Sequence, residues 1–218
     1  PGPAGACTTP SVVGYPAKGG PPLVGEVARR QAAVNERATF FSVKRLIGRR
    51  PDELDNRIFD LVPYEISDDV PDRDVELILP QQAPGGFGEQ ARRLRPDQVS
   101  SEVLRALKSQ AEAHLGEPVT AAVVSVPAYF ATPQREATQR AAERAGLEVL
   151  RVINEPAAAA LSYGYGQADH EYVCVFDLGG GTFDVSVLQV GDQVFEVLSS
   201  GGDNFLGGDD FDACIVDW

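Results

Sequence analysis

Apolar residues recur at helical spacing in the middle of the chain and mark two amphipathic helices. The first runs from Val99 to Leu115 and is followed by Gly116, a residue type that commonly ends helices. The second runs from Pro133 to Ala145, with proline in its first turn and Gly146 directly after it. The spacing predicts a helix over each segment.

Short apolar runs alternate with these helices. We expect an apolar strand over Thr120–Val126 and another strand over Leu147–Ile153, and Pro156 begins a helix of small residues over Ala157–Tyr163. Helices that alternate with strands are typical of a parallel sheet with right-handed crossovers. The sequence therefore predicts an α/β fold for this region.

After His170 the pattern changes to strands joined by tight turns. We expect antiparallel strands over Val173–Leu178, Thr182–Val190 and Val194–Ser200, with turns at Gly179–Gly181 and Gly191–Asp192. The composition also changes between Tyr165 and Glu171, which predicts a domain boundary there.

The first 95 residues carry a weaker pattern, from which we expect loops, short strands and one helical stretch. The expected elements are a loop over Pro1–Pro10, a strand in Ser11–Tyr15, a helical pattern over Glu26–Gly48, strands over Ile58–Ile66 and Val75–Leu79 with Asp68 and Asp69 between them, and a polar connection over Pro84–Arg95.

Composition and charge narrow the function classes. The 218 residues carry a net charge of −13, which argues against nucleic acid and anionic membranes as partners, because both attract basic surfaces. No apolar run is long enough to span a bilayer. The three cysteines form no disulfide framework or zinc pattern, which favours a reducing compartment such as the cytoplasm.

The candidate chemistry lies in the glycine turn between two of the expected strands. An apolar strand ends at Asp177, the turn Gly179–Gly181 follows, and Thr182 and Asp184 open the return strand. Glycine amides can approach phosphate oxygens closely, and neighbouring carboxylates can hold a hydrated Mg²⁺ against them. A tight hairpin with two solvated aspartates is the alternative. The P-loop motif and the dinucleotide fingerprint are both absent.

Five stretches in this order resemble the ATPase domain of the 70-kilodalton heat-shock chaperones, the DnaK type. They are SVKRLIGR (42–49), VVSVPAYF (123–130), VINEPAAAALSYG (152–164), FDLGGGTFDVS (176–186) and GGDNFLGGDDFD (201–212). The resemblance begins at Thr8 and covers nearly the whole chain. It implies an actin-like ATPase fold with ribonuclease-H-like lobes, in which ATP or ADP and Mg²⁺ lie between the lobes.

In that fold residues 1–166 correspond to most of lobe I, and residues 167–218 to the first strands of lobe II. The family's first phosphate motif is expected before Thr8, and its adenosine-binding segments after Trp218, so both ends of the fold are incomplete. Methionine is absent from the chain, which also indicates an internal piece. Because strands are missing, we expect the piece to be marginally stable and to bind ATP poorly.

Site roles follow from the resemblance, position by position. Lys44 matches a lysine beside the γ-phosphate, Glu155 a glutamate that orients water near the metal, and Asp177 a proton acceptor in the metal network. The remaining matches are Gly179, Gly180, Gly181, Thr182 and Gly208 for phosphate contact, Asp184 for the metal, and Pro127 and Arg135 for coupling to the interdomain linker. Ala131 and Thr132 depart from the family pattern beside the coupling positions.

The resemblance also implies partners: unfolded client proteins bound by a separate substrate domain, a J-domain co-chaperone and a nucleotide exchange factor. Two other functions stay open. The chain can belong to a non-catalytic interaction module derived from a chaperone, or to a sugar or acetate kinase of the same superfamily.

Overall fold

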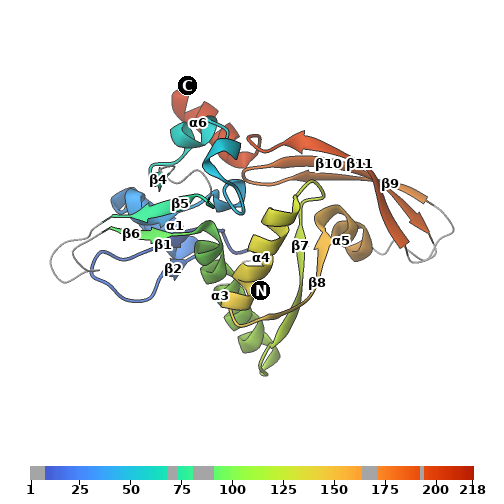
Figure 1. Ribbon diagram of the computed structural model, residues 1–218, viewed down its shortest axis with the longest axis horizontal. Helices are drawn as coiled ribbons and strands as arrows, with labels where there is room; N and C mark the ends of the chain where they lie inside the picture. The colour runs from blue at the N-terminus through green and yellow to red at the C-terminus, as the bar shows by residue number, and fades with distance from the viewer. Residues whose placement is uncertain (1–7, 68–72, 81–90, 164–170, 192–193) are drawn as a thin grey trace. The chain divides into compact units, whose positions relative to one another are not determined.

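The chain folds into helices and several small sheets (Figure 1). The computed structural model describes residues 8–67, 73–80, 91–163, 171–191 and 194–218. These residues form two compact units, one of Pro1–Ala122 with Thr132–Leu150, the other of Val123–Ala131 with Arg151–Trp218. The α/β class expected from the sequence is confirmed.

The first unit opens with a small antiparallel sheet in the order β2-β1-β3. The expected strand in Ser11–Tyr15 is confirmed as β1, whereas the expected helical stretch over Glu26–Gly48 is broken into several pieces. It breaks because Asn35 leaves the helical region and donates its side-chain amide to the carbonyl oxygen of Tyr15 at 2.9 Å. The elements are β1 (Val13–Gly14), β2 (Leu23–Val24), α1 (Glu26–Gln31), η2 (Ala32–Val34), η3 (Glu36–Ala38), β3 (Thr39–Phe40) and η4 (Val43–Arg45).

A second antiparallel sheet has the order β4-β5-β6. Its strands are β4 (Glu65–Ser67), β5 (Glu76–Leu79) and β6 (Arg92–Leu94), and η5 (Pro51–Glu53) and α2 (Arg57–Leu61) precede them. The predicted strand at Val75–Leu79 is confirmed, but the prediction for Ile58–Ile66 is wrong over its first half. Ile58 and Val62 are buried four residues apart, which is helical spacing. Asp68 and Asp69 lie outside the described residues.

Strand β6 was not expected, because the sequence predicted only a polar connection there. Its two arginines are exposed, and Leu94 alone is buried, so no apolar alternation marks the strand. Pairing with β5 forms the strand. Most of the remaining connection lies outside the described residues.

Two long helices, α3 (Pro96–Leu115) and α4 (Thr132–Arg144), pack against each other in the first unit. Both confirm the predictions to within three residues at each end. Gly116 ends α3 in the left-handed conformation, with φ 75°. The strands β7 (Ala121–Val126) and β8 (Glu148–Asn154) pair with each other, and they also confirm the predicted strands.

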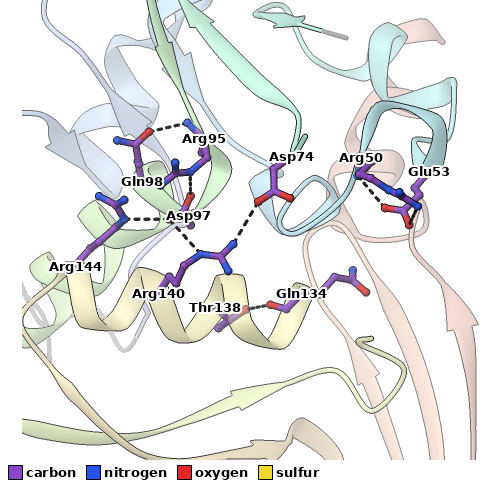
Figure 2. A network of polar contacts seen from close by, with 10 residues as sticks. All are labelled: Arg50, Glu53, Asp74, Arg95, Asp97, Gln98, Gln134, Thr138, Arg140 and Arg144. Carbon is purple, nitrogen blue, oxygen red and sulfur yellow. Dashed lines mark hydrogen bonds and ion pairs between the residues drawn. The ribbon is translucent and has the colours of Figure 1, made fainter. Parts of the chain in front are cut away.

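A cluster of arginines around one buried carboxylate joins these two helices (Figure 2). The side chain of Asp97 on α3 is 2% exposed and accepts hydrogen bonds from Nε of Arg95 and Nε of Arg144, each at 3.0 Å. Arg140 lies 4.0 Å from the same carboxylate and 3.3 Å from Asp74, which precedes β5. Side chains from α3, α4 and the β5 edge therefore meet at Asp97.

The second unit is built on an antiparallel meander in the order β11-β10-β9. The helix α5 packs on one face of the meander, where Ala160 contacts Leu188 and Val190 in a small apolar core. This confirms the predicted hairpins. The elements are α5 (Glu155–Ser162), β9 (Glu171–Leu178), β10 (Phe183–Gly191), β11 (Val194–Asp203) and α6 (Gly208–Asp217).

The predicted domain boundary falls mostly on residues 164–170, which lie outside the described residues. The compact units divide the chain differently, because α5 contacts the meander and is counted with it. The assignment of 1–166 and 167–218 to two lobes of an ATPase domain stays a prediction. Among the helices of the described residues, none has both the length and the apolar character needed to cross a membrane.

Candidate functional site

The glycine turn closes the hairpin between β9 and β10. Leu178 pairs with Phe183 at the end of the ladder, and the N–H of Gly179 donates to the carbonyl oxygen of Thr182 at 2.9 Å. The turn itself is Gly180–Gly181. Neither residue carries a Cβ, so the outer edge of the turn is bare backbone.

The first residues of α6 lie against this turn. The N–H of Gly208 donates to the carbonyl oxygen of Gly179 at 3.1 Å, and the N–H of Asp209 donates to that of Gly180 at 2.7 Å. A Cβ added at Gly207 would stand 2.4 Å from the carbonyl oxygen of Gly180, closer than real contacts allow. The two glycine-rich stretches therefore form one close-packed backbone junction.

Strand register places the acidic residues of the turn side by side. Asp184 on β10 is the direct partner of Asp177 on β9, and Gly202 on β11 is the next residue along the same row. In an antiparallel sheet, directly opposed residues point to the same face. The two carboxylates therefore share one face of the meander.

The row beside them holds two serines. Ser186 on β10 is opposite Ser200 on β11, and their Oγ atoms are 3.0 Å apart. Side chains two positions apart lie on the same face of a strand, so the serines and aspartates share a face. Farther along this face Leu188 is fully buried beside α5. The face is thus apolar beneath α5 and polar toward the glycine turn.

A small hollow, open to solvent, lies over the polar part of this face. Glu155, the first residue of α5, and the chain that follows β7 also line it. The lining residues, all from the second unit, are Pro127, Ala128, Glu155, Pro156, Val175, Asp177, Asp184, Ser186 and Ser200. Four residues predicted from the sequence therefore line one hollow: Pro127, Glu155, Asp177 and Asp184.

The donor set of the hollow suits a hydrated divalent cation. Carboxylate oxygens and water are the ligands that Mg²⁺ prefers, and Mg²⁺ commonly keeps several waters. Within the described residues, no group of three or more His, Cys, Asp or Glu side chains is close enough to hold a metal directly. Any cation at the three carboxylates of the hollow would therefore be held mainly through water and through a ligand's phosphate oxygens, and the predicted metal role of these residues stays a prediction.

The other predicted site residues lie outside the hollow lining. Thr182 and the turn glycines follow Asp177 in the same hairpin, and Gly208 begins α6 beside them. Lys44 is exposed on η4, and Arg135 is half-buried on α4, both in the first unit. Their predicted places beside a phosphate and in coupling stay predictions.

The sequence reasoning missed Ser186 and Ser200. Ser186 follows Asp184 at a spacing of two, which places both on one face of a strand and is a signal that the sequence contains. Ser200 gave no such signal. Its partner depends on the pairing of β10 with β11, and the register of that pairing shifts between Val187 and Leu188.

Comparison with known proteins gives one consistent result. The sequence profile of the family described as Hsp70 protein matches residues 2–218. Chaperone protein DnaK of Deinococcus deserti is 54% identical over 98% of this chain and 32% of its own length. Chaperone protein DnaK 1 of Synechococcus sp. is 52% identical over 98% of this chain and 27% of its own length. Chaperone protein dnaK of Cyanidium caldarium is 50% identical over 97% and 32%, respectively.

The chain thus spans about a third or less of the length of these curated relatives. The match covers all the described elements of both units.

Proposed function

This chain belongs to the Hsp70 protein family, and we propose that it is part of the ATP-binding and ATP-hydrolysing domain of a molecular chaperone. The observation that carries the proposal is the hollow of the second unit. Asp177, Asp184 and Glu155 line it, and the glycine turn follows Asp177 directly. We further propose the actin-like two-lobed architecture, with residues 1–166 in lobe I and 167–218 in lobe II.

The turn is proposed to bind the phosphates of ATP. Gly180 and Gly181 carry no side chains that would keep phosphate oxygens away, and the Thr182 hydroxyl is a further donor at the same turn. Gly208 is proposed as a further phosphate-contacting glycine, and its N–H donates to the carbonyl oxygen of Gly179, which holds the turn against α6. The close packing at Gly207 leaves no room for a side chain between the turn and the start of α6.

The carboxylates are proposed to order water around the phosphates. Mg²⁺, when bound with the nucleotide, would supply positive charge that neutralises the charge developing on the phosphoryl oxygens. Asp184 and Glu155 accept hydrogen bonds from the waters of the site, and Asp177 accepts the proton of the attacking water as the phosphoryl bond to ADP breaks. Lys44 supplies positive charge for the transferred phosphoryl group.

Chaperone activity extends the proposal beyond this chain. Hydrolysis would control client binding by a separate substrate domain, with a J-domain co-chaperone and a nucleotide exchange factor as partners and with Pro127 and Arg135 in the coupling path. Cys174 and Cys214 are free and exposed, which supports a reducing compartment such as the cytoplasm.

A calorimetric titration tests the proposal. The intact parent protein should bind ATP in a Mg²⁺-dependent manner. Residues 1–218 alone should give no measurable heat, because the family's adenosine-binding segments are expected after Trp218. In the parent, Lys44→Ala should abolish turnover and leave nucleotide binding intact.

The outcomes separate the candidate functions. An intact protein that binds no nucleotide would overturn the proposal and favour a non-catalytic interaction module. Phosphorylation of a sugar or acetate by the intact protein would select a small-molecule kinase. Turnover that persists in Lys44→Ala would show that only the role of Lys44 is wrong.

A further inference from the structure

The hydroxyl pair in the hollow has more hydrogen-bonding capacity than its own contact uses. Ser186 is 2% exposed, Ser200 is exposed, and the two Oγ atoms are 3.0 Å apart. Each hydroxyl carries one proton, and only one of the two protons can lie between the oxygens. In either arrangement the pair keeps one proton for a third group. Among the residues that the structure describes, no protein acceptor takes that second proton.

The surroundings of the pair indicate what accepts it. The hollow is lined by the carboxylates of Asp177, Asp184 and Glu155, and it is open to solvent. Water is therefore the available acceptor, and any water there also lies among carboxylates. A water that accepts from a hydroxyl directs its own protons toward nearby anions.

Packing alone does not explain two polar side chains at this point of the sheet. On the same face Leu188 is 0% and Val190 1% exposed, in an apolar core with α5. Ser186 is just as buried one row away, but it faces Ser200 and the hollow. The face changes from apolar to polar where the carboxylates begin.

We propose that Ser186 and Ser200 are positioning residues of the ATPase site: the pair donates one hydrogen bond to the water that Asp184 and Glu155 hold for the hydrated cation. This inference rests on the proposed function, because it assigns a role within the same hollow. The serines touch neither nucleotide nor metal in this arrangement. They fix the orientation of the water that does.

Ser200 is the better position to test, since its side chain is exposed and its replacement leaves no buried gap. Ser199→Ala is a matched control: Ser199 is also exposed on β11, but it pairs with Val187 on the opposite face and is absent from the hollow lining. Ser200→Thr keeps the hydroxyl and serves as the conservative variant.

The intact protein should show a split between rate and binding. Outer-shell partners of metal sites typically affect activity or metal affinity by about 10- to 100-fold. We expect Ser200→Ala to lower kcat about tenfold with KM for ATP unchanged. Its nucleotide complex should also bind Mg²⁺ more weakly in calorimetric titrations. The unfolding midpoint without nucleotide should equal that of Ser199→Ala, and Ser200→Thr should recover most of the loss.

Three results would overturn the inference. Equal kinetics and equal Mg²⁺ affinity in Ser200→Ala and Ser199→Ala would exclude a positioning role while leaving the ATPase proposal standing. A lowered unfolding midpoint in Ser200→Ala, in proportion to its loss of activity, would assign the pair to fold stability. Absence of hydrolysis in the unchanged parent would remove the proposed function, and this inference with it.

Discussion

Gly207 lies against Gly180 with no room between them for a side chain. A Cβ at position 207 would be 2.4 Å from the Gly180 carbonyl oxygen and 2.6 Å from the Gly181 nitrogen. Both neighbours are backbone atoms and cannot rotate away as a flexible side chain would. The backbone conformation at Gly207 is extended, so this glycine is required by the close approach and not by its dihedral angles.

Gly207→Ala should therefore detach the start of α6 from the glycine turn. Forced overpacking of this kind costs about 1–3 kcal/mol of stability. In hydrogen exchange of the intact protein, the amides of Gly208 and Asp209 should lose protection, because they donate to the turn. Gly201→Ala is the control, since a Cβ there meets nothing within 4 Å. Unchanged protection in Gly207→Ala would contradict this reading of the junction.

The buried Asp97 of the first unit is a second position at which a substitution should lower the stability of the protein. Asp97→Asn keeps the shape of the side chain but removes the charge that two arginine Nε–H groups share at 3.0 Å. Charge-assisted hydrogen bonds contribute about 1.5–3 kcal/mol each when buried, and the arginines are partly exposed, so we expect a loss of about 2 kcal/mol. Urea unfolding of the intact protein measures it.

Glu26→Gln is the matched control for Asp97→Asn. Glu26 pairs with Arg30 at 3.0 Å, but both side chains are more than half exposed. Surface pairs contribute little, so the midpoint should barely move. Equal effects of the two substitutions would show that Asp97 does not hold α3 and α4 together.

Periodicity predicted the parts of this fold that local patterns control. The helices α3 and α4 and the meander β9–β11 carry repeated apolar spacing, and each formed where expected. The short run at Ile58–Leu61 has too few apolar positions to separate a strand from a helical turn, and it folded as α2. Strand β6 has one buried side chain, Leu94, so pairing with β5 and not its own pattern defines it.

The candidate site divides in the same way. Asp177 and Asp184 could be predicted because a turn of fixed length joins them in one motif. The contact of Ser186 with Ser200 depends on a register that shifts within the hairpin. The contact of Gly207 with Gly180 joins residues that are separated along the chain by two strands, β10 and β11. Neither distance is encoded in a local pattern, so both required the structure.

Two buried tyrosines predict a loss of stability at alkaline pH. Burial raises the pKa of Tyr15 to about 12 from an ordinary 10.0, and burial also raises the pKa of Tyr64, whose hydroxyl donates to the Phe41 carbonyl oxygen. The folded state therefore keeps both protons where the unfolded chain releases them. The stabilisation is fully present below pH 10 and is lost as the pH rises toward 12.

Unfolding free energies measured across this range test the assignment. Tyr64→Phe should lose about 1 kcal/mol at neutral pH through the missing hydrogen bond, and its stability should then fall less steeply above pH 10. Tyr172→Phe replaces a tyrosine that is 72% exposed and should retain the alkaline slope of the unchanged protein. If stability fell equally steeply above pH 10 in all three proteins, burial would not raise the pKa of Tyr64.

Two features of Gly48 disfavour a side chain, its positive φ and its close approach to α4, and a pair of substitutions separates their effects. Its φ is 64°, and a Cβ there would stand 2.6 Å from the carbonyl oxygen of Pro133 and the Cα of Gln134, at the start of α4. Gly116 has a similar φ of 75°, but a Cβ there meets nothing within 4 Å. Gly116→Ala should therefore cost only the backbone term, about 1–2 kcal/mol. Gly48→Ala should cost about 1–3 kcal/mol more, because α4 must also move. Thermal unfolding of the two variants gives this difference directly. Equal losses would mean that the backbone of α4 yields freely at Gln134, and that Gly48 is needed for its dihedral angle alone.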